Sequence, residues 1–263
     1  MKKFFIIFIF LFSTFLLVTA SSTETLFPAS ELNNGEYLRY RVHYMLINAG
    51  YATLTTSETN YNGKPHYHVV GEGYSTGSAK LFFKVEDRYE TYMDKATLLS
   101  SKFIRKIRES SYVRNQSMTI DHINKKITYT NESDKTSKYF TYTGEIHDML
   151  SAFYYLRNMN TDGYKSGDFI SLNIFLDYEM LNFKLKILSR ETIKSNFGKV
   201  KCIKLRPYVL SGRVFKEKES VTMWVTDDVN HIPIQIKAEL AVGSLKADLS
   251  NYKNLQSPIN FIK

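Results

Sequence analysis

The chain has 263 residues, a formal net charge of +9 and a single cysteine, Cys202. This length supports a sizeable hydrophobic core, in one large domain or in two smaller ones. A single cysteine excludes an intramolecular disulfide, so packing alone must hold the fold together. The basic charge favours anionic partners such as lipid head groups or acidic glycans.

The N-terminal segment has the features of a secretory signal peptide. Lys2 and Lys3 precede an apolar run from Phe4 to Val18, and Val18-Thr19-Ala20 presents small or compact residues to a signal peptidase. The run is shorter than the roughly twenty residues that cross a bilayer, and no comparable run follows it. We therefore expect cleavage near Ala20 and no transmembrane segment in the mature chain.

Export without a cysteine framework indicates a protein of the bacterial envelope. Removal of Lys2 and Lys3 with the signal peptide lowers the formal charge from +9 to +7. Because no cysteine follows Ala20 before the first strand, we do not expect lipid attachment at the mature N-terminus. The sequence thus predicts a protein that diffuses freely in the periplasm, where nucleic acid is not expected as a partner.

Strand-like alternation begins after a polar leader. Leu38, Tyr40, Val42, Tyr44 and Leu46 fall on one face of the first expected strand, which predicts a half-buried strand. Further strand-like runs cover approximately residues 51–59, 66–76, 81–93, 97–109, 112–122, 126–141, 168–177, 180–193, 197–209, 216–226, 232–242 and 244–253. Short turns join them, which favours antiparallel pairing.

One segment has helical rather than strand periodicity. Its apolar residues recur at spacings of three and four and are Met149, Ala152, Phe153, Leu156 and Met159. Asp148 is placed to cap the first turn, and Arg157 lies near the end, where a cation is favourable. The sequence therefore predicts one helix at about residues 148–159.

Weak internal similarity indicates two related halves. Gly35-Glu36 matches Gly167-Asp168, and the turn at Asn62-Gly63 matches Phe197-Gly198 in the same order. We predict a polar leader at 21–34, a first β unit at 35–146, a linking helix at 147–163 and a second β unit at 164–256. Chance similarity of strand-turn-strand sequences is the alternative, and whether the two units form one continuous domain stays open.

The fold class that follows is all-β. We expect an antiparallel curved sheet or barrel built from the two halves, with the helix packed against it. A flat sheet of about a dozen strands would overstrain its twist and expose its edges, so it is expected to curl or close.

No Gly-x-Ser-x-Gly elbow, phosphate-binding loop, HExxH motif or dinucleotide-binding fingerprint appears in the mature chain. His66 and His68 share a strand face but lack a visible third ligand, so we predict no metal site and no cofactor. Cys202 is expected to be a small strand side chain. For an envelope-glycan hydrolase, Asp87, Asp227 and Asp228 are the carboxylates to test.

Aromatic and basic residues supply the remaining candidates. Aromatic side chains make up 14% of the chain, and they can fill a core or line an apolar cavity. The expected ligand-binding residues are Tyr40, Tyr44, Phe153 and Trp224. On the strand 97–109, alternation places Lys102, Lys106 and Arg108 on one face, which could contact an anionic surface or could simply be solvated.

Three stretches resemble an uncharacterised family of exported bacterial proteins, domain of unknown function 3108. They are Gly35-Glu36-Tyr37-Leu38-Arg39-Tyr40 with Ala49-Gly50-Tyr51-Ala52, Asp148 to Arg157, and Met223 to Asp228 followed by Ile232-Pro233. The resemblance implies a β-rich envelope protein without established activity, so it carries over no catalytic residues. The overall plan is also similar to the Lol-type lipoprotein carriers, at the level of fold analogy only.

Three functions are consistent with these features. The first is a non-enzymatic periplasmic binding or carrier protein for a lipid or other apolar envelope component. The second is a structural or interaction protein of the envelope, and the third is the glycan hydrolase. An enclosed apolar cavity would favour the first, a filled core the second, and a close carboxylate pair the third.

Overall fold

The computed structural model describes residues 32–210 and 221–262. The predicted signal peptide and nearly all of the polar leader lie outside this range. The first part of the chain contains β1 (Tyr37–Tyr44), β2 (Ile47–Tyr61), β3 (Lys64–Ser75), α1 (Gly77–Phe82), β4 (Glu86–Asp94), β5 (Ser100–Glu109), β6 (Tyr112–Asp121), β7 (Lys126–Asn131) and β8 (Thr136–Thr141). The second part contains α2 (Met149–Arg157), β9 (Phe169–Leu176), β10 (Glu179–Ser195), β11 (Gly198–Leu210), β12 (Val221–Thr226), β13 (Pro233–Glu239), β14 (Ser244–Lys253) and β15 (Phe261–Ile262).

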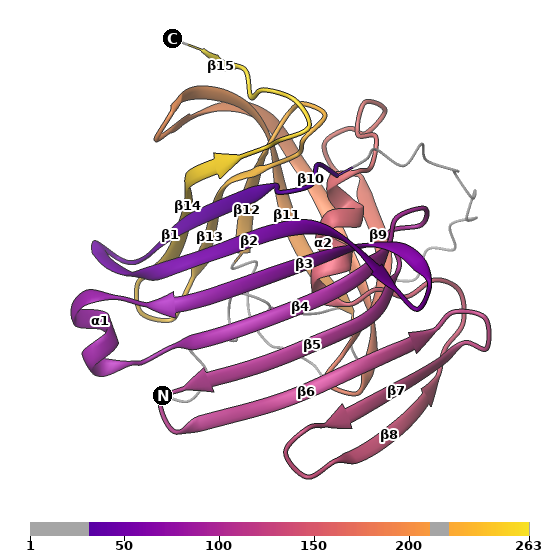
Figure 1. Cartoon of the computed structure of the whole chain (residues 1–263). Coiled ribbons are helices and arrows are strands. Elements are labelled where there is room, and N and C mark those ends of the chain that lie inside the picture. The colour runs from indigo at the N-terminus through magenta and orange to yellow at the C-terminus, as the bar shows by residue number, and fades with distance from the viewer. Residues whose placement is uncertain (1–31, 211–220, 263) are drawn as a thin grey trace.

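These strands form a single antiparallel sheet (Figure 1). Its order is β8-β7-β6-β5-β4-β3-β2-β1-β14-β13-β12-β11-β10-β9, and β15 pairs with β11. The two halves of the chain meet where β1 pairs with β14, with Val42 opposite Ala247. The predicted all-β curved sheet is confirmed, and the sheet is not closed into a barrel, because β8 and β9 end it on either side.

The sheet curls around α2. This helix contacts both β4 and β9, which lie far apart in the strand order, so the sheet must bend to bring both against it. Gly71 on β3 allows close packing, because a Cβ there would lie 3.2 Å from Leu54 Cδ2 and 3.5 Å from Leu150 Cδ2. None of the helices in the described part of the chain is long and apolar enough to cross a membrane.

The start of α2 is fixed by its cap. The Asp148 carboxylate accepts hydrogen bonds from the backbone N–H groups of Leu150 at 2.7 Å and Ser151 at 3.0 Å. The Ser151 hydroxyl in turn accepts from the Asp148 N–H at 2.9 Å, which completes a capping box. The second Asp148 oxygen accepts from the Thr91 hydroxyl of β4 at 2.5 Å, so the cap also ties the helix to the sheet.

Three local features differ from the sequence-based expectation. The predicted strand at 81–93 begins with α1, a helix with no buried residue, and the strand proper starts only at Glu86. The predicted strand at 126–141 is the hairpin of β7 and β8. Leu46, expected on the buried face of the first strand, is 98% exposed because β1 ends at Tyr44 and the chain turns there.

The two halves begin with strands of similar length. β1, β2 and β3 have 8, 15 and 12 residues, and β9, β10 and β11 have 8, 17 and 13. Gly35 and Gly167, which precede the two sets, both have positive φ. A relationship between the two units remains a prediction.

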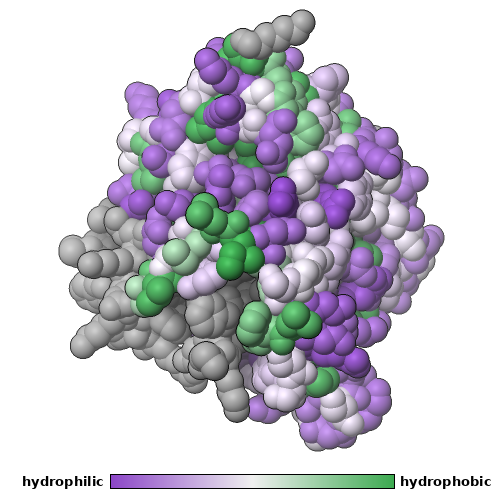
Figure 2. All heavy atoms as spheres, turned by 90° about the vertical axis from the view of Figure 1, so that its left-hand side faces the viewer, coloured by the Kyte–Doolittle hydropathy of each residue, from purple (hydrophilic) through white to green (hydrophobic). Residues whose placement is uncertain are grey.

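Large apolar side chains are exposed at the end of the sheet that carries α1. Figure 2 looks onto this end and shows apolar groups among the polar surface. They come from the β1–β2 turn, α1, the β5–β6 turn and the β13–β14 turn. We call this set the apolar end, and it comprises Met45, Leu46, Ile47, Leu81, Phe82, Tyr112, Val113 and Val242.

Candidate functional site

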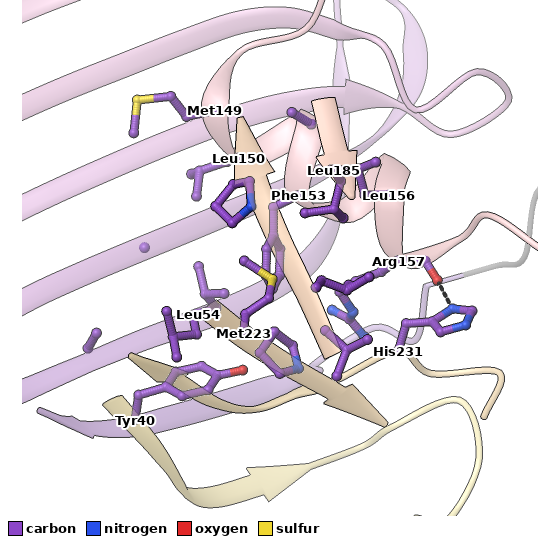
Figure 3. Close-up of a pocket in the computed structure, with 18 of the residues that line it drawn as sticks. Tyr40, Leu54, Met149, Leu150, Phe153, Leu156, Arg157, Leu185, Met223 and His231 are labelled. Atoms are coloured by element: carbon purple, nitrogen blue, oxygen red, sulfur yellow. Dashed lines mark hydrogen bonds between the residues drawn. The ribbon is translucent and has the colours of Figure 1, made fainter. Parts of the chain in front are cut away.

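The space between α2 and the concave face of the sheet holds a cavity of about 350 Å³ (Figure 3). This volume lies in the range of small-molecule binding sites. Its wall is formed by α2 together with β1 to β4 and β9 to β13. The site therefore draws on both halves of the chain, and the β1–β14 junction and α2 hold these halves together.

Most of the lining is aliphatic or aromatic. The apolar lining includes Val42, Ala52, Leu54, Met149, Leu150, Phe153, Leu156, Ile170, Ile174, Phe183, Leu185, Ile203, Leu205, Met223, Val225 and Ile236. The strand residues among them alternate with outward residues, as expected for one face of each strand. Such a wall favours an apolar ligand, because burial of its hydrocarbon surface removes that surface from water.

A buried ion pair closes one side of the cavity. Arg157, in the last turn of α2, donates from Nη1 to Glu36 Oε1 at 2.7 Å and from Nη2 to Glu36 Oε2 at 2.9 Å. Its Nε donates to the carbonyl oxygen of Asn230 at 3.1 Å. Both partners are buried, and Glu36 is 2% exposed. The guanidinium charge that faces the cavity is thus compensated by a bidentate carboxylate.

His231 continues this polar side without adding charge. Its Nδ1 lies 2.8 Å from the Arg157 carbonyl oxygen, and its Nε2 lies 3.0 Å from the Thr161 hydroxyl. Burial lowers the pKa of His231 below its usual value, so the ring is neutral at neutral pH. Figure 3 shows Arg157 and His231 together on one side of the cavity, with Met149, Leu150 and Leu54 on the other side.

Tyr40 is the polar side chain on the cavity floor. It is 5% exposed, and among the described residues no group forms a hydrogen bond with its hydroxyl. In Figure 3 the ring lies along the floor with the hydroxyl directed toward the side of Arg157. Burial raises the pKa of Tyr40, so the phenol keeps its proton.

Of the four side chains expected to bind a ligand, the structure brings Tyr40 and Phe153 together in the cavity wall. Tyr44 packs against the core between β1 and β14, and its hydroxyl donates to the Val242 carbonyl at 3.0 Å. Trp224 lies on the outer face of β12, where its Nε1 donates to Glu191 Oε1 at 2.6 Å. Its neighbours Met223 and Val225 line the cavity instead.

The basic residues of β5 lie on the outer face of the sheet. Lys106 and Arg108 are exposed and Lys102 is partly buried, whereas the alternate residues Phe103, Arg105 and Ile107 are buried on the inner face. The structure therefore keeps Lys102, Lys106 and Arg108 on one surface. Their role as a contact for an anionic surface remains a prediction.

The three carboxylates considered for hydrolysis are not brought together. Asp87 is the second residue of β4, at the end of the sheet that carries α1, and burial raises its pKa. Asp227 and Asp228 follow β12 at the opposite end, and five strands lie between β4 and β12 in the sheet order. Asp227 forms an ion pair with Arg190, and Asp228 Oδ1 accepts from the Thr226 hydroxyl at 2.6 Å.

The two histidines of β3 are each held by a different neighbour. His66 Nε2 lies 2.8 Å from the Ser101 hydroxyl, and His68 Nε2 lies 2.9 Å from Glu90 Oε2. In the described ranges, no group of three or more Cys, His, Asp or Glu side chains is arranged to hold a metal ion.

Residues 39–250 match the family model described as protein of unknown function DUF3108. The chain belongs to the DUF3108 family. The match spans the strands and the helix that build the cavity, and it confirms the resemblance drawn from the sequence. A search of the curated proteins found no match to this DUF3108 chain.

Three solved structures are similar to this DUF3108 protein at low sequence identity. The beta-barrel-like DUF1849 protein of Brucella abortus superposes with a TM-score of 0.56 at 9% identity, over 86% of this chain and 100% of that one. A putative exported protein with a YmcC-like fold from Bacteroides fragilis gives 0.35 at 8% identity, over 86% and 100% of the two chains. A putative lipoprotein from Parabacteroides distasonis gives 0.36 at 12% identity, over 86% and 97%. The first of these supports the β-barrel-like fold.

The three stretches that carry the family resemblance meet at the buried ion pair. Glu36 comes from the first stretch and Arg157 from the second, while Asn230, which accepts from Arg157, lies between Asp228 and Ile232 of the third. Sequence reasoning assigned Arg157 to the helix dipole and gave Glu36 no role. Glu36 and Arg157 both lie in stretches that resemble the same family, and this shared resemblance is the sequence signal that could have identified them.

Proposed function

We propose that the protein binds an apolar molecule of the bacterial envelope, such as a lipid acyl chain, in the cavity between α2 and the sheet, and that it acts as a non-enzymatic carrier. The observation that carries the proposal is the cavity of about 350 Å³ with its largely aliphatic wall. The aliphatic part of this wall offers no hydrogen bonds to water, so it favours hydrocarbon over water.

The exported location supports the same reading. The predicted signal peptide would bring the chain to the periplasm, where acyl chains that move between membranes must be shielded from water. The alternative of a glycan hydrolase requires carboxylates close together. Asp87 lies at one end of the sheet and the pair Asp227 and Asp228 at the other, which argues against this alternative. A purely structural role would not require an open apolar space beneath α2.

The test is a titration with a fluorescent twelve-carbon acyl probe. Ala52 lies on the inner face of β2, opposite Tyr40 in the register, and contributes to the cavity wall. We expect saturable binding by the wild type and a loss of about tenfold or more in Ala52→Phe, since a phenyl group would occupy the space that an acyl chain needs.

Thr55→Phe is the matched control, because Thr55 is exposed on the outer face of the same strand. It should bind the probe as the wild type does. Thermal unfolding of both variants verifies that they are folded, since overpacking alone costs about 1–3 kcal/mol. Equal binding by Ala52→Phe and Thr55→Phe would place the probe outside the cavity, and no saturable binding by the wild type would contradict the proposed function.

A further inference from the structure

The Tyr40 hydroxyl differs from those of the other buried tyrosines. The described residues contain five buried tyrosines, and the hydroxyls of four form hydrogen bonds within the protein. These four contacts are Tyr67 with the Leu32 N–H at 3.1 Å, Tyr129 with Gln116 Oε1 at 2.8 Å, Tyr142 with His122 Nδ1 at 2.8 Å and Tyr154 with the Thr56 hydroxyl at 3.0 Å. Tyr40 is the exception in this part of the chain.

An unpaired buried hydroxyl is unusual because it loses its hydrogen bonds to water without replacement. Tyr40 is also the one buried tyrosine that lines the cavity. A phenylalanine at position 40 could pack as well as the tyrosine does, because its neighbours on the same face of β1, Leu38 and Val42, are apolar. The hydroxyl is therefore placed where a bound molecule, rather than the protein, can supply the partner.

The charges around this hydroxyl indicate which partner fits. Arg157 and Glu36 lie near it and neutralise each other through their bidentate pair. His231 is held by Arg157 and Thr161 and adds no charge at neutral pH. A ligand carboxylate would thus enter an apolar site without an unpaired cation to meet it, which is costly. An uncharged acceptor, such as a carbonyl oxygen, carries no such cost.

We propose that Tyr40 is the polar anchor of the cavity and donates a hydrogen bond to the carbonyl oxygen of a neutral acyl ester or amide. This inference rests on the proposed function and names the ligand class of the same site. A phenol donates more strongly than it accepts, because the ring withdraws electron density from the oxygen. The hydrocarbon part of the ligand then lies against Leu150, Phe153 and Met223.

The experiment compares two probes of equal length, methyl laurate and tetradecane, by displacement of the fluorescent acyl probe. Wild type and Tyr40→Phe are measured side by side. For Tyr40→Phe we expect methyl laurate to bind about three- to tenfold more weakly, which is the value of one neutral hydrogen bond, and tetradecane to bind unchanged. Ionised laurate should bind the wild type more weakly than methyl laurate does.

A spectroscopic measurement separates a hydrogen bond from a packing effect. With methyl laurate labelled with ¹³C at the carbonyl, the infrared band of the bound ester should lie at lower frequency in the wild type than in Tyr40→Phe. Ligand-free Tyr40→Phe should unfold at the same temperature as the wild type or higher, since it removes an unpaired polar group.

The outcomes distinguish this inference from the proposed function. If methyl laurate binds both proteins equally and its infrared band does not move, the anchor is refuted while the carrier function stands. A lower unfolding temperature of ligand-free Tyr40→Phe would show a partner within the protein and would also refute it. If neither methyl laurate nor tetradecane binds the wild type, the proposed function fails and the anchor fails with it.

A second inference rests on a separate observation, the apolar end. Leu46 is 98% exposed in the β1–β2 turn, and Phe82 is 87% exposed in α1, a helix that buries none of its residues. Monomeric soluble proteins rarely expose apolar side chains in contiguous groups, and such groups mark interaction sites.

Backbone contacts place the loops of the apolar end side by side. The Met45 N–H donates to the Ser244 carbonyl at 2.9 Å, which joins the β1–β2 and β13–β14 turns. The Thr76 N–H donates to the Ala49 carbonyl at 3.1 Å, which joins the start of α1 to β2. The Ser110 N–H donates to the Lys84 carbonyl at 2.7 Å and adds the β5–β6 turn. The exposed residues thus lie at the same end of the sheet, where Figure 2 shows several apolar groups with polar residues between them.

Basic residues border this surface. Arg108 pairs in register with Val113 at the β5–β6 turn, and Lys106 lies two residues before it on the same outer face of β5. Lys80 lies within α1 itself, directly before Leu81 and Phe82. Apolar side chains that can enter the acyl region, next to lysine and arginine that can meet phosphate groups, are the features of a peripheral membrane contact.

We propose that the apolar end docks on an anionic lipid surface. The test is sedimentation of the protein with vesicles of phosphatidylglycerol and phosphatidylethanolamine, compared with vesicles of phosphatidylcholine alone. The wild type should bind the anionic vesicles in a salt-sensitive manner. Leu46→Ser with Phe82→Ser should weaken binding about tenfold or more, because each side chain would otherwise bury its hydrocarbon in the membrane.

The matched control is Ile123→Ser. Ile123 is 88% exposed but lies in the β6–β7 turn, at the opposite end of the sheet, so this variant should bind as the wild type does. The double variant Lys106→Gln and Arg108→Gln should weaken binding to the anionic vesicles and leave any binding to the phosphatidylcholine vesicles unchanged. Equal binding by all variants, or none by the wild type, would refute docking on lipid. A dimer in sedimentation velocity that is lost in Leu46→Ser with Phe82→Ser would show that a second copy covers this end, and would refute it as well.

Discussion

Loss of the carboxylate at Glu36 should lower the free energy of unfolding more than a substitution at the protein surface does. In Glu36→Gln the Arg157 guanidinium would remain buried with its charge uncompensated. The wild-type pair has two hydrogen bonds of 2.7 and 2.9 Å, and Glu36 is 2% exposed. Breaking such a pair costs about 3–5 kcal/mol, and for a chain of this size that corresponds to about 6–20 °C in unfolding temperature.

The assay is urea unfolding at 25 °C of the chain without its predicted signal peptide, with Arg157→Met as the reciprocal variant. Arg157→Met leaves the Glu36 carboxylate buried without its partner, just as Glu36→Gln leaves the Arg157 guanidinium without its own. Each single variant should therefore lower the free energy of unfolding by about 3–5 kcal/mol.

The double variant Glu36→Gln with Arg157→Met completes the cycle. Its loss of unfolding free energy should be smaller than the sum of the losses in the two single variants, because neither buried charge remains without a partner. A deficit below about 1 kcal/mol for Glu36→Gln would mean that water reaches the pair and would refute this reasoning.

Three further predictions follow from buried polar groups. Asp148→Ala removes the cap of α2 and its contact with Thr91, so it should lower the unfolding free energy by about 1–3 kcal/mol in urea titrations. An unfolding free energy equal to that of the wild type would show that the cap does not stabilise the helix. Burial lowers the pKa of His147 from 6.5 to about 3, so folding stability should fall as the pH drops below 6.5, and His147→Leu should flatten that dependence. Burial raises the pKa of Cys202 to about 12, so a thiol reagent at pH 8 should react only in denaturant; rapid labelling of the folded protein would contradict the burial.

Local patterns predicted the elements of the fold well. Period-two alternation and turn residues predicted the antiparallel strands, and the spacing of Met149, Ala152, Phe153 and Leu156 predicted α2. Asp148 was correctly identified as its cap. These signals are local because the side-chain periods of strands and helices and the hydrogen bonds of a cap involve residues close in the chain.

Features that depend on distant pairing could not be read from the sequence. Glu36 and Arg157 are 121 residues apart, and neither carries a local pattern that names the other. Trp224 and its neighbours on β12 are all large and apolar, so alternation alone does not decide which of them faces the cavity. The helix α1 was missed because its exposed apolar residues Leu81 and Phe82 precede a strand and look like part of it.

The most direct test of the carrier account is native mass spectrometry of the protein, purified gently from the bacterium that makes it. The account predicts a second species heavier than the bare chain by the mass of a neutral acyl ester or amide. This species should be reduced in Ala52→Phe and retained in Thr55→Phe. Bare chain alone in all three proteins, together with no saturable binding of acyl probes, would contradict it.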